Sequence, residues 1–356
     1  MKLMMVRPLA CLLIAAIALG ACASEPATRK GPRPELQINL GSYSNPTPPG
    51  KPDKQGIVYT LSGNDTLRYF WGKGFRTIRL PVNWERLQPR PFGPLNKAKL
   101  AELTDFLNRA RKVGFRVIPD VHAFGEHNGH KLGSKELPTS ALADFWTKLI
   151  KVYPGRFAGY DIMNEPHDMP SPQAWPEAAQ KTVDAIRKID RTTTIYVEGD
   201  DWASAGRWMQ SNATLDIKDP ARRLVYSAHV YFDKDTSGLY KFPYEKDGTY
   251  PEIAPERLRP FVNWLRLRGF KGHIGESGVP SDHPGWIKTL DLFLKEVSAS
   301  GDVLVGYAYW AGGDWTDSWN ITVQPKPDGK WKDRPQMKLL TDYIAASGGR
   351  KMKKAP

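Results

Sequence analysis

The chain has 356 residues, of which 40% are hydrophobic and 11% aromatic, and its formal net charge is +13. This length fits one large domain or two ordinary ones, and the hydrophobic content supports a sizeable core and excludes a disordered chain. Basic residues are spread along the sequence, apart from a tail at residues 350–356, and no nucleic-acid motif accompanies them. We therefore expect no nucleic-acid partner.

The first residues predict a processing segment. A basic start precedes an apolar run over residues 9–19, which has signal-peptide length and is short for a membrane span. The run ends in Leu19-Gly20-Ala21-Cys22, which looks like a bacterial lipobox. We predict a signal peptide over residues 1–21 and a lipid on Cys22, with ordinary cleavage beside Ala23 as the alternative. Removal of residues 1–21 would lower the charge from +13 to +11 and leave no disulfide.

Residues 22–34 are polar and proline-rich, and we expect them to form a flexible tether behind the lipidated cysteine. The predicted product is an exported protein, lipid-anchored in the bacterial cell envelope, in the periplasm or at the outer membrane. Its positive charge would favour an acidic polysaccharide or an anionic surface.

Beyond the tether, short apolar runs alternate with amphipathic helical stretches. The predicted strands cover residues 36–40, 77–82, 116–122, 159–164, 194–198, 225–231, 272–276 and 303–310. The predicted helices cover residues 65–73, 100–113, 142–153, 175–189, 203–210, 255–268, 286–297 and 336–344. The long segment 233–253, rich in Gly, Pro and Tyr, is expected to be a loop over the site.

Eight alternating units favour an α/β fold, a closed (β/α)₈ TIM barrel that forms a single domain over residues 35–349. A doubly wound open sheet is the alternative, and it would concentrate polar residues at one switch point. Nearly every predicted strand instead ends in polar or aromatic residues: Asn39, Arg79, His122, Asn164 with Glu165, Glu198, His229 with Tyr231, Glu276 and Trp310.

Two glutamates at strand ends suggest the chemistry. Glu165 lies in Asn164-Glu165-Pro166-His167 after one apolar run, and Glu276 ends another. Glycoside hydrolysis needs such a pair, because one carboxyl group protonates the leaving oxygen while the other attacks or activates water. Either residue alone could equally be a surface glutamate that closes a strand.

With these residues in place, the sequence resembles glycoside hydrolase family 5, the cellulase family of retaining (β/α)₈ glycosidases. The resemblance covers roughly residues 36–345. The family has eight near-invariant positions, and this chain supplies them in order: Arg79, His122, Asn164, Glu165, His229, Tyr231, Glu276 and Trp310. The segments 80–89 and 232–238 look like the endoglucanase branches.

The resemblance implies a role for each position. Glu165 is the expected acid/base and must hold a proton when substrate arrives, whereas Glu276 is the expected nucleophile and must be ionised. Arg79 would favour the charged form of Glu276, unless it is only a salt bridge that fixes the barrel. Asn164 is the expected donor to the sugar 2-hydroxyl, and Tyr231 would hydrogen-bond the nucleophile.

The remaining positions would shape the pocket. His122 and His229 are expected to form hydrogen bonds, since no histidine spacing resembles a zinc motif, and we predict neither metal nor cofactor. Trp310 is the expected sugar platform at the reacting subsite, with a core tryptophan as the alternative. Candidate outer platforms follow other strands or lie in the last loop: Trp84, Trp202, Trp315 and Trp319.

The chain departs from common cellulase patterns at Ala123-Phe124, where many relatives have Asn-Tyr, and in the loop 312–317. These changes leave the chemistry alone and bear on substrate identity. We predict a monomeric, retaining, endo-acting hydrolase of β-1,4-glucosidic bonds. The alternatives are the same mechanism on another β-glycan, such as mannan, xyloglucan or a bacterial exopolysaccharide, and a lipoprotein that binds glycan without cutting it.

Overall fold

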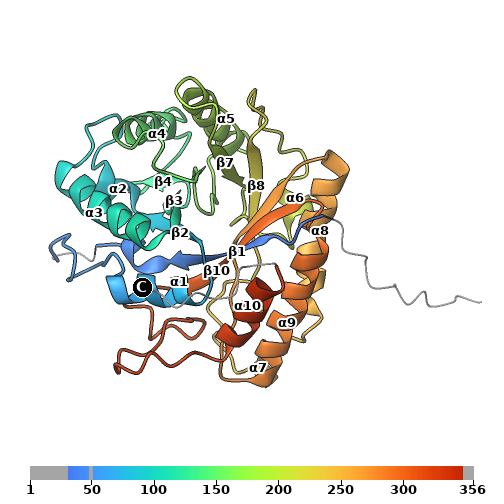
Figure 1. Ribbon diagram of the computed structural model, residues 1–356. Coiled ribbons are helices and arrows are strands. Elements are labelled where there is room, and N and C mark those ends of the chain that lie inside the picture. The colour runs from blue at the N-terminus through green and yellow to red at the C-terminus, as the bar shows by residue number, and fades with distance from the viewer. Residues whose placement is uncertain (1–30, 48–50, 348–356) are drawn as a thin grey trace, which may run out of the picture.

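A computed structural model describes residues 31–47 and 51–347, and in this part the chain forms a closed barrel of parallel strands with helices on the outside (Figure 1). The predicted signal peptide (1–21), Cys22 with the tether up to residue 30, and the predicted tail (350–356) lie outside the described residues. Among the described residues, no helix has both the length and the apolar character needed to cross a membrane.

The barrel strands follow one another in the order β1-β10-β9-β8-β7-β6-β3-β2. They are β1 (Glu35–Leu40), β2 (Thr77–Val82), β3 (Arg116–Val121), β6 (Gly159–Asp161), β7 (Thr194–Glu198), β8 (Leu224–His229), β9 (Gly272–Glu276) and β10 (Leu304–Gly312). All six residues of β2 are buried, as expected for a strand covered on both faces. The predicted TIM barrel is confirmed, and the open sheet is wrong because β1 pairs with both β2 and β10.

The register of the barrel sets up the site. Parallel pairing places Asn39 opposite Arg79 on β1 and β2, and His229 opposite Glu276 on β8 and β9. Gly275 precedes Glu276 on β9, and a Cβ there would lie 2.8 Å from Nε2 of His229. A residue without a side chain is therefore required at Gly275 for the two strands to present His229 and Glu276 side by side.

Helices fill the connections between strands. They are α1 (Asn64–Gly72), α2 (Trp84–Leu87), α3 (Lys97–Val113), α4 (Ala141–Val152), α5 (Ala174–Arg187), α6 (Trp208–Ser211), α7 (Tyr244–Asp247), α8 (Ile253–Arg268), α9 (Pro284–Ala299) and α10 (Gln336–Ala345). A short 3₁₀ helix, η1 (Gly41–Ser44), follows β1. The ends of α3 illustrate the local signals, since Asn96 accepts hydrogen bonds from two backbone N–H groups and Gly114 ends the helix at φ 116°.

The structure differs from the predicted elements in the loops above the barrel. The helix expected over residues 203–210 forms only from Trp208 onward, as α6, because Ala203 has φ 50° and Ser204 pairs with His229 in an isolated bridge. A two-stranded sheet of β4 (Glu126–His127) and β5 (His130–Lys131) was not predicted. The expected loop 233–253 includes the short helix α7.

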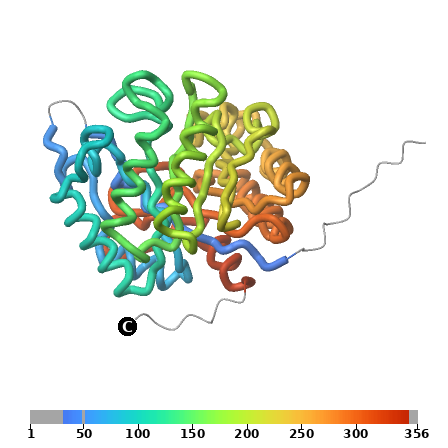
Figure 2. Tube along the Cα trace, turned by 90° about the horizontal axis from the view of Figure 1, so that it is seen from above, coloured from blue at the N-terminus to red at the C-terminus, as the bar shows by residue number. Residues whose placement is uncertain are grey.

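The charged groups of the barrel interior gather toward the C-terminal ends of the strands, above a layer that mixes apolar side chains with the buried His273 and Gln37. Ile118, Tyr196 and Val225 form a separate buried cluster near the start of the strands. The two ends of the described chain meet, since the Tyr343 hydroxyl on α10 donates to the Pro34 carbonyl just before β1 (2.9 Å), and these segments lie side by side in Figure 2. In a (β/α)₈ barrel the C-terminal ends of the strands form the face that carries the site.

Candidate active site

A cavity of about 760 Å³ is lined by residues at the C-terminal ends of the strands and in the loops that follow. Six of the eight predicted family positions line it: His122, Glu165, His229, Tyr231, Glu276 and Trp310. The other two, Arg79 and Asn164, are fully buried and contact one another, Nη2 to Oδ1, at 2.9 Å. Residues 235–239 form one wall of the cavity, so part of the loop predicted over residues 233–253 does border the site.

The two glutamates meet across the cavity. Glu165 follows β6 and Glu276 ends β9, and one carboxylate oxygen of each lies within 4.8 Å of the other and of a ring nitrogen of His229. The side chain of Glu276 is 5% exposed and that of Glu165 is 14% exposed. Folding thus places two carboxyl groups from distant parts of the chain on the two sides of one narrow gap in the cavity.

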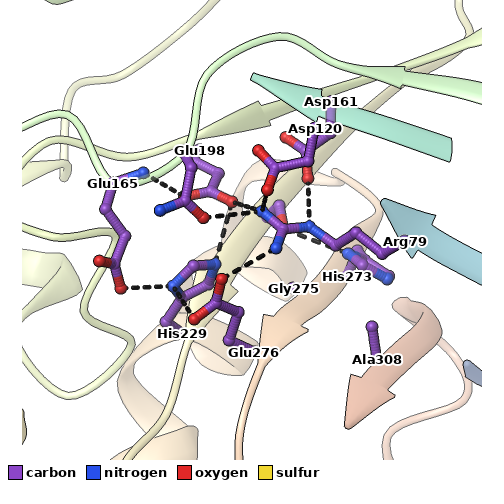
Figure 3. Close-up of polar contacts among 12 residues, drawn as sticks. Arg79, Asp120, Asp161, Glu165, Glu198, His229, His273, Gly275, Glu276 and Ala308 are labelled. Carbon is purple, nitrogen blue, oxygen red and sulfur yellow. Dashed lines mark hydrogen bonds and ion pairs between the residues drawn. The ribbon is translucent and has the colours of Figure 1, made fainter. Parts of the chain in front are cut away.

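Arg79 lies at the centre of a buried charge network (Figure 3). Its guanidinium is fully buried and contacts four carboxylates: Asp120 (3.1 Å), Asp161 (2.8 Å), Glu198 (2.8 Å) and Glu276 (2.9 Å). Burial lowers the pKa of Arg79, but the four carboxylates outweigh it and raise this pKa well above its ordinary value. Arg79 is therefore a permanent cation that fixes the position of Glu276.

Both oxygens of Glu276 are held. Oε1 accepts from Nη1 of Arg79, and Oε2 accepts from the Tyr231 hydroxyl at 2.9 Å. Burial and the neighbouring Glu165 raise the pKa of Glu276, while His229, Arg79 and His122 lower it, and the net direction is upward. Arg79 thus favours the charged form of Glu276, as expected, but burial is the largest effect and acts in the opposite direction.

His229 bridges two glutamates. Its Nδ1 lies 2.6 Å from Oε1 of Glu165, and its Nε2 lies 2.9 Å from Oε1 of Glu198. Burial lowers the pKa of His229, but Glu198, Glu276 and Glu165 raise it well above 6.5. The neighbouring carboxylates thus favour the imidazolium form of His229, in which both nitrogens donate.

His122 connects the charge network to the aromatic part of the site. Its Nδ1 lies 2.9 Å from Oδ2 of Asp120 and 4.0 Å from Oε1 of Glu276. The ring stacks on Trp310 with centroids 5.4 Å apart and an interplanar angle of 5°. Trp310 is partly exposed and stacks in turn on Trp319 (5.8 Å, 19°). The predicted platform, Trp310, therefore lies between His122 and the last loop.

The candidate outer platforms differ in how much of each side chain is exposed. Trp202 is 43% exposed, lines the cavity and stacks on His167 with centroids 3.4 Å apart. Trp315 is 44% exposed in the loop after β10. The proposal for Trp84 is wrong: it is fully buried, and its indole N–H donates to the Gln88 side chain (3.0 Å). Trp84 begins α2 and turns into the core, so it packs under the barrel helices.

Three buried carboxylates of the site were not assigned from the sequence. Asp120 and Asp161 contact Arg79, and Glu198 contacts Arg79, His229 and the Glu165 backbone. Glu198 was visible as a polar strand end. Asp120 and Asp161 belong to largely apolar strands, where a buried acid is not expected. The structure shows why they are tolerated, because both contact Arg79 in the barrel interior.

Two trios in the described residues are close enough to hold a metal ion: Asp120, His122 and Glu276, and Glu165, His229 and Glu276. The same atoms are already engaged by cations and donors. Arg79 and Tyr231 donate to the two oxygens of Glu276, and both nitrogens of His229 donate to carboxylates. The donor set therefore fits internal ion pairing better than metal ligation.

Comparison with known proteins agrees with this geometry. The family model described as Cellulase (glycosyl hydrolase family 5) matches residues 49–313. A probable endo-β-1,4-glucanase B from Neosartorya fischeri is 30% identical over 283 residues, which cover 78% of this chain and 82% of the relative. The corresponding enzyme from Emericella nidulans is 29% identical and covers 77% of this chain and 81% of its own length.

Solved structures are also similar. Endoglucanase Cel5A from Pseudomonas stutzeri is 37% identical with a TM-score of 0.81, over 90% of this chain and 97% of that one. An endo-β-1,4-glucanase from Xanthomonas axonopodis pv. citri is 34% identical with a TM-score of 0.81, over 88% and 99% of the two chains. Together with the family match and the paired glutamates at the strand ends, these similarities establish that the chain belongs to the cellulase family, glycosyl hydrolase family 5.

Proposed function

We propose that this glycoside hydrolase cuts internal β-1,4-glucosidic bonds of a β-glucan with retention of configuration. The main support for this proposal is that oxygens of Glu165 and Glu276 lie within 4.8 Å of one another in a cavity at the strand ends. Retaining enzymes hold their two carboxyl groups about 5–5.5 Å apart, whereas inverting enzymes leave about 6.5–9.5 Å for a water molecule. The named endoglucanases among its relatives support the choice of substrate.

In the first step, the Glu276 carboxylate attacks the anomeric carbon and the bond from that carbon to the leaving oxygen breaks. Glu165 donates its proton to that oxygen, so the shortened glucan leaves as an alcohol and the sugar stays as an ester of Glu276. In the second step, Glu165 removes a proton from water, the water oxygen attacks the anomeric carbon, and the Glu276 carboxylate is released.

The buried amide of Asn164 supports binding of the reacting sugar. Its Oδ1 accepts from Arg79, which leaves the amide nitrogen as the only free group, and that nitrogen has no acceptor among the described residues. A buried donor without an acceptor costs free energy unless a ligand satisfies it. The sugar 2-hydroxyl is the acceptor that we assign to Asn164, and this contact strengthens as the transition state develops.

The decisive experiment is digestion of defined cello-oligosaccharides with product anomers followed by NMR. We expect β-anomers first, with internal bonds cut. First-formed α-anomers would contradict retention. Release of only the terminal sugar or disaccharide would contradict internal cutting, and activity confined to mannan or xyloglucan would contradict the choice of substrate.

We also propose that the enzyme is exported and anchored in the cell envelope by a lipid on Cys22. Support comes from the apolar run before Cys22 and from a polysaccharide substrate that cannot enter a cell. Labelling with a fatty-acid analogue in a bacterial host should mark the wild-type chain and spare Cys22→Ser. Equal labelling of both chains, or of neither, would contradict the anchor.

A further inference from the structure

Glu198 occupies a central position between the residues of the proposed proton transfer. It ends β7 with no exposed surface, and its backbone carbonyl accepts from the Trp175 indole N–H (2.8 Å). Its Oε1 accepts from Nη2 of Arg79 (2.8 Å) and from Nε2 of His229 (2.9 Å), and its Oε2 accepts from the Glu165 backbone N–H (2.7 Å), as Figure 3 shows. Both oxygens of Glu198 thus face donors only.

These contacts hold Glu165 at two points. The backbone of Glu165 has φ 46°, a left-handed conformation that is strained for a residue with a side chain, and Glu198 accepts the N–H of that same residue. At the other end, Oε1 of Glu165 accepts from Nδ1 of His229, whose second nitrogen donates to Glu198. One buried carboxylate therefore fixes both the backbone and, through His229, the carboxyl group of Glu165.

We propose that Glu198 is a positioning residue for proton donation by Glu165, acting through the Glu165 backbone and through His229. The inference rests on the proposed function, in which Glu165 protonates the leaving oxygen. Glu198 touches no part of the substrate in this scheme. Its contribution is to hold the donor at one geometry, and geometry is what proton transfer to a leaving group requires.

An amide cannot replace the Glu198 carboxylate. A glutamine has one accepting oxygen and one NH₂ group, and the NH₂ would face either Glu165 N–H or the donors of Arg79 and His229. Titratable groups from other strands also face this network: Asp120 from β3, Asp161 from β6, and Glu276 and His273 from β9. A control substitution must therefore remove a carboxylate from this network without touching Glu165 or His229.

Asp161 provides that control. Its Oδ2 accepts from Nε of Arg79 (2.8 Å), its Oδ1 has no hydrogen-bond partner among the described residues, and no contact joins it to Glu165 or His229. An asparagine keeps the shape of this side chain and removes one of the four carboxylates that contact Arg79. Asp161→Asn reports the general cost of altering the Arg79 network.

The test compares kcat/KM on two probes, cellotetraose and 2,4-dinitrophenyl β-cellobioside. A dinitrophenolate leaves without help from an acid, whereas a sugar alkoxide needs a proton. We expect Glu198→Gln to lose about 10²-fold on cellotetraose and less than about tenfold on the aryl glycoside. Glu165→Gln should show the same pattern more strongly, and Asp161→Asn should lower both values by the same factor.

The ratio of the two kcat/KM values does not depend on how much of a preparation is folded, so a poorly folding Glu198→Gln protein still gives an answer. If that protein yields no activity at all, Glu198→Asp, which keeps the charge but shortens the reach, takes its place with the same expected ratio. Equal losses on both probes would overturn the role of Glu198. A missing pattern for Glu165→Gln would instead overturn the proposed proton donor.

Discussion

The floor and the rim of the cavity are built by different physical means. The floor, defined as Arg79, Asp120, Asp161, Glu198 and Glu276, is a buried network joined by ion pairs of 2.8–3.1 Å, and it reaches the cavity surface through Glu276. The rim, defined as Phe124, Trp202 and Leu239, lines the same cavity with apolar surface, of which Trp202 exposes 43% and Leu239 60%.

The difference shows how one barrel separates chemistry from binding. The floor groups come from five strands of the barrel, and the four carboxylates share one cation, Arg79. Loss of Arg79 would therefore leave several buried carboxylates without their cation. The rim groups come from loops and offer area to a sugar chain, so a change to one removes contact surface and little else. Substitutions on the floor should therefore affect turnover or stability, whereas those on the rim should affect binding.

The largest expected effect belongs to Glu276→Ala. Loss of the nucleophile should lower kcat on a soluble glucan on the order of 10⁴-fold or more, with the fold retained. Activity assays beside circular dichroism would check this, and Glu136→Gln, an exposed glutamate remote from the cavity lining, is the matched control. Wild-type turnover by purified Glu276→Ala protein would refute the nucleophile assignment.

Arg79→Lys should destabilise the floor next most strongly. A lysine has three donors at one point and cannot reach four carboxylates that the guanidinium contacts from three nitrogens. We expect a loss of about 3–5 kcal/mol in the free energy of unfolding, measured by urea denaturation. Arg266→Lys, at an exposed ion pair, should cost less than about 1 kcal/mol. Equal losses in the two variants would mean that the buried network contributes no more to stability than an exposed ion pair does.

Tyr231→Phe should have an intermediate effect on activity. It removes the hydroxyl that donates to Oε2 of Glu276 and leaves the Arg79 contact to Oε1. Hydrogen bonds to charged groups contribute about 1.5–3 kcal/mol, so we expect kcat/KM to fall about 10- to 100-fold. Steady-state kinetics on cellotetraose would measure it, and an unchanged value would show that Arg79 alone positions the nucleophile.

On the rim, Trp202→Ala should raise KM for long cello-oligosaccharides about three- to tenfold and leave unfolding nearly unchanged, because stacking area is lost at an exposed side chain. Trp84→Ala supplies the contrast. That tryptophan is fully buried, so its truncation should cost about 3–5 kcal/mol in stability and leave KM as it was. A raised KM for Trp84→Ala with an unchanged KM for Trp202→Ala would mean that Trp84, and not Trp202, binds the sugar chain.

The smallest effect is a displaced pH profile in the wild type. Burial raises the pKa of Glu276 above 4.5, and the nucleophile works only when ionised. As pH falls, Glu276 therefore takes up its proton earlier than an ordinary glutamate, and kcat/KM should decline through a pH above 4.5. Tyr231→Phe should move this limb further upward, because a donor to the charged form is lost. A limb below 4.5 would contradict the direction.

The sequence predicted most of the barrel because each strand is a short apolar run. The helices between the strands were also recognisable, because their apolar residues repeat with a 3.6-residue period and a glycine often marks where a helix stops. Residues 77–82, 194–198 and 272–276 were predicted with the bounds of β2, β7 and β9. Loop conformation was not predictable. The helix expected from residue 203 starts only at Trp208, because Ala203 is left-handed and Ser204 and Ala205 pair with His229, a tertiary contact that local sequence does not encode.

What the sequence alone determined is the set of chemical groups at the strand ends, since a (β/α)₈ pattern sends every strand end to one face. Which groups touch was decided only by closure of the barrel. His229 lies opposite Glu276 because of the β8–β9 register, and Glu198 lies between Arg79, His229 and Glu165 because three other strands converge on it. Local sequence carries no record of such distances, because they depend on how strands far apart in the chain are tilted and paired.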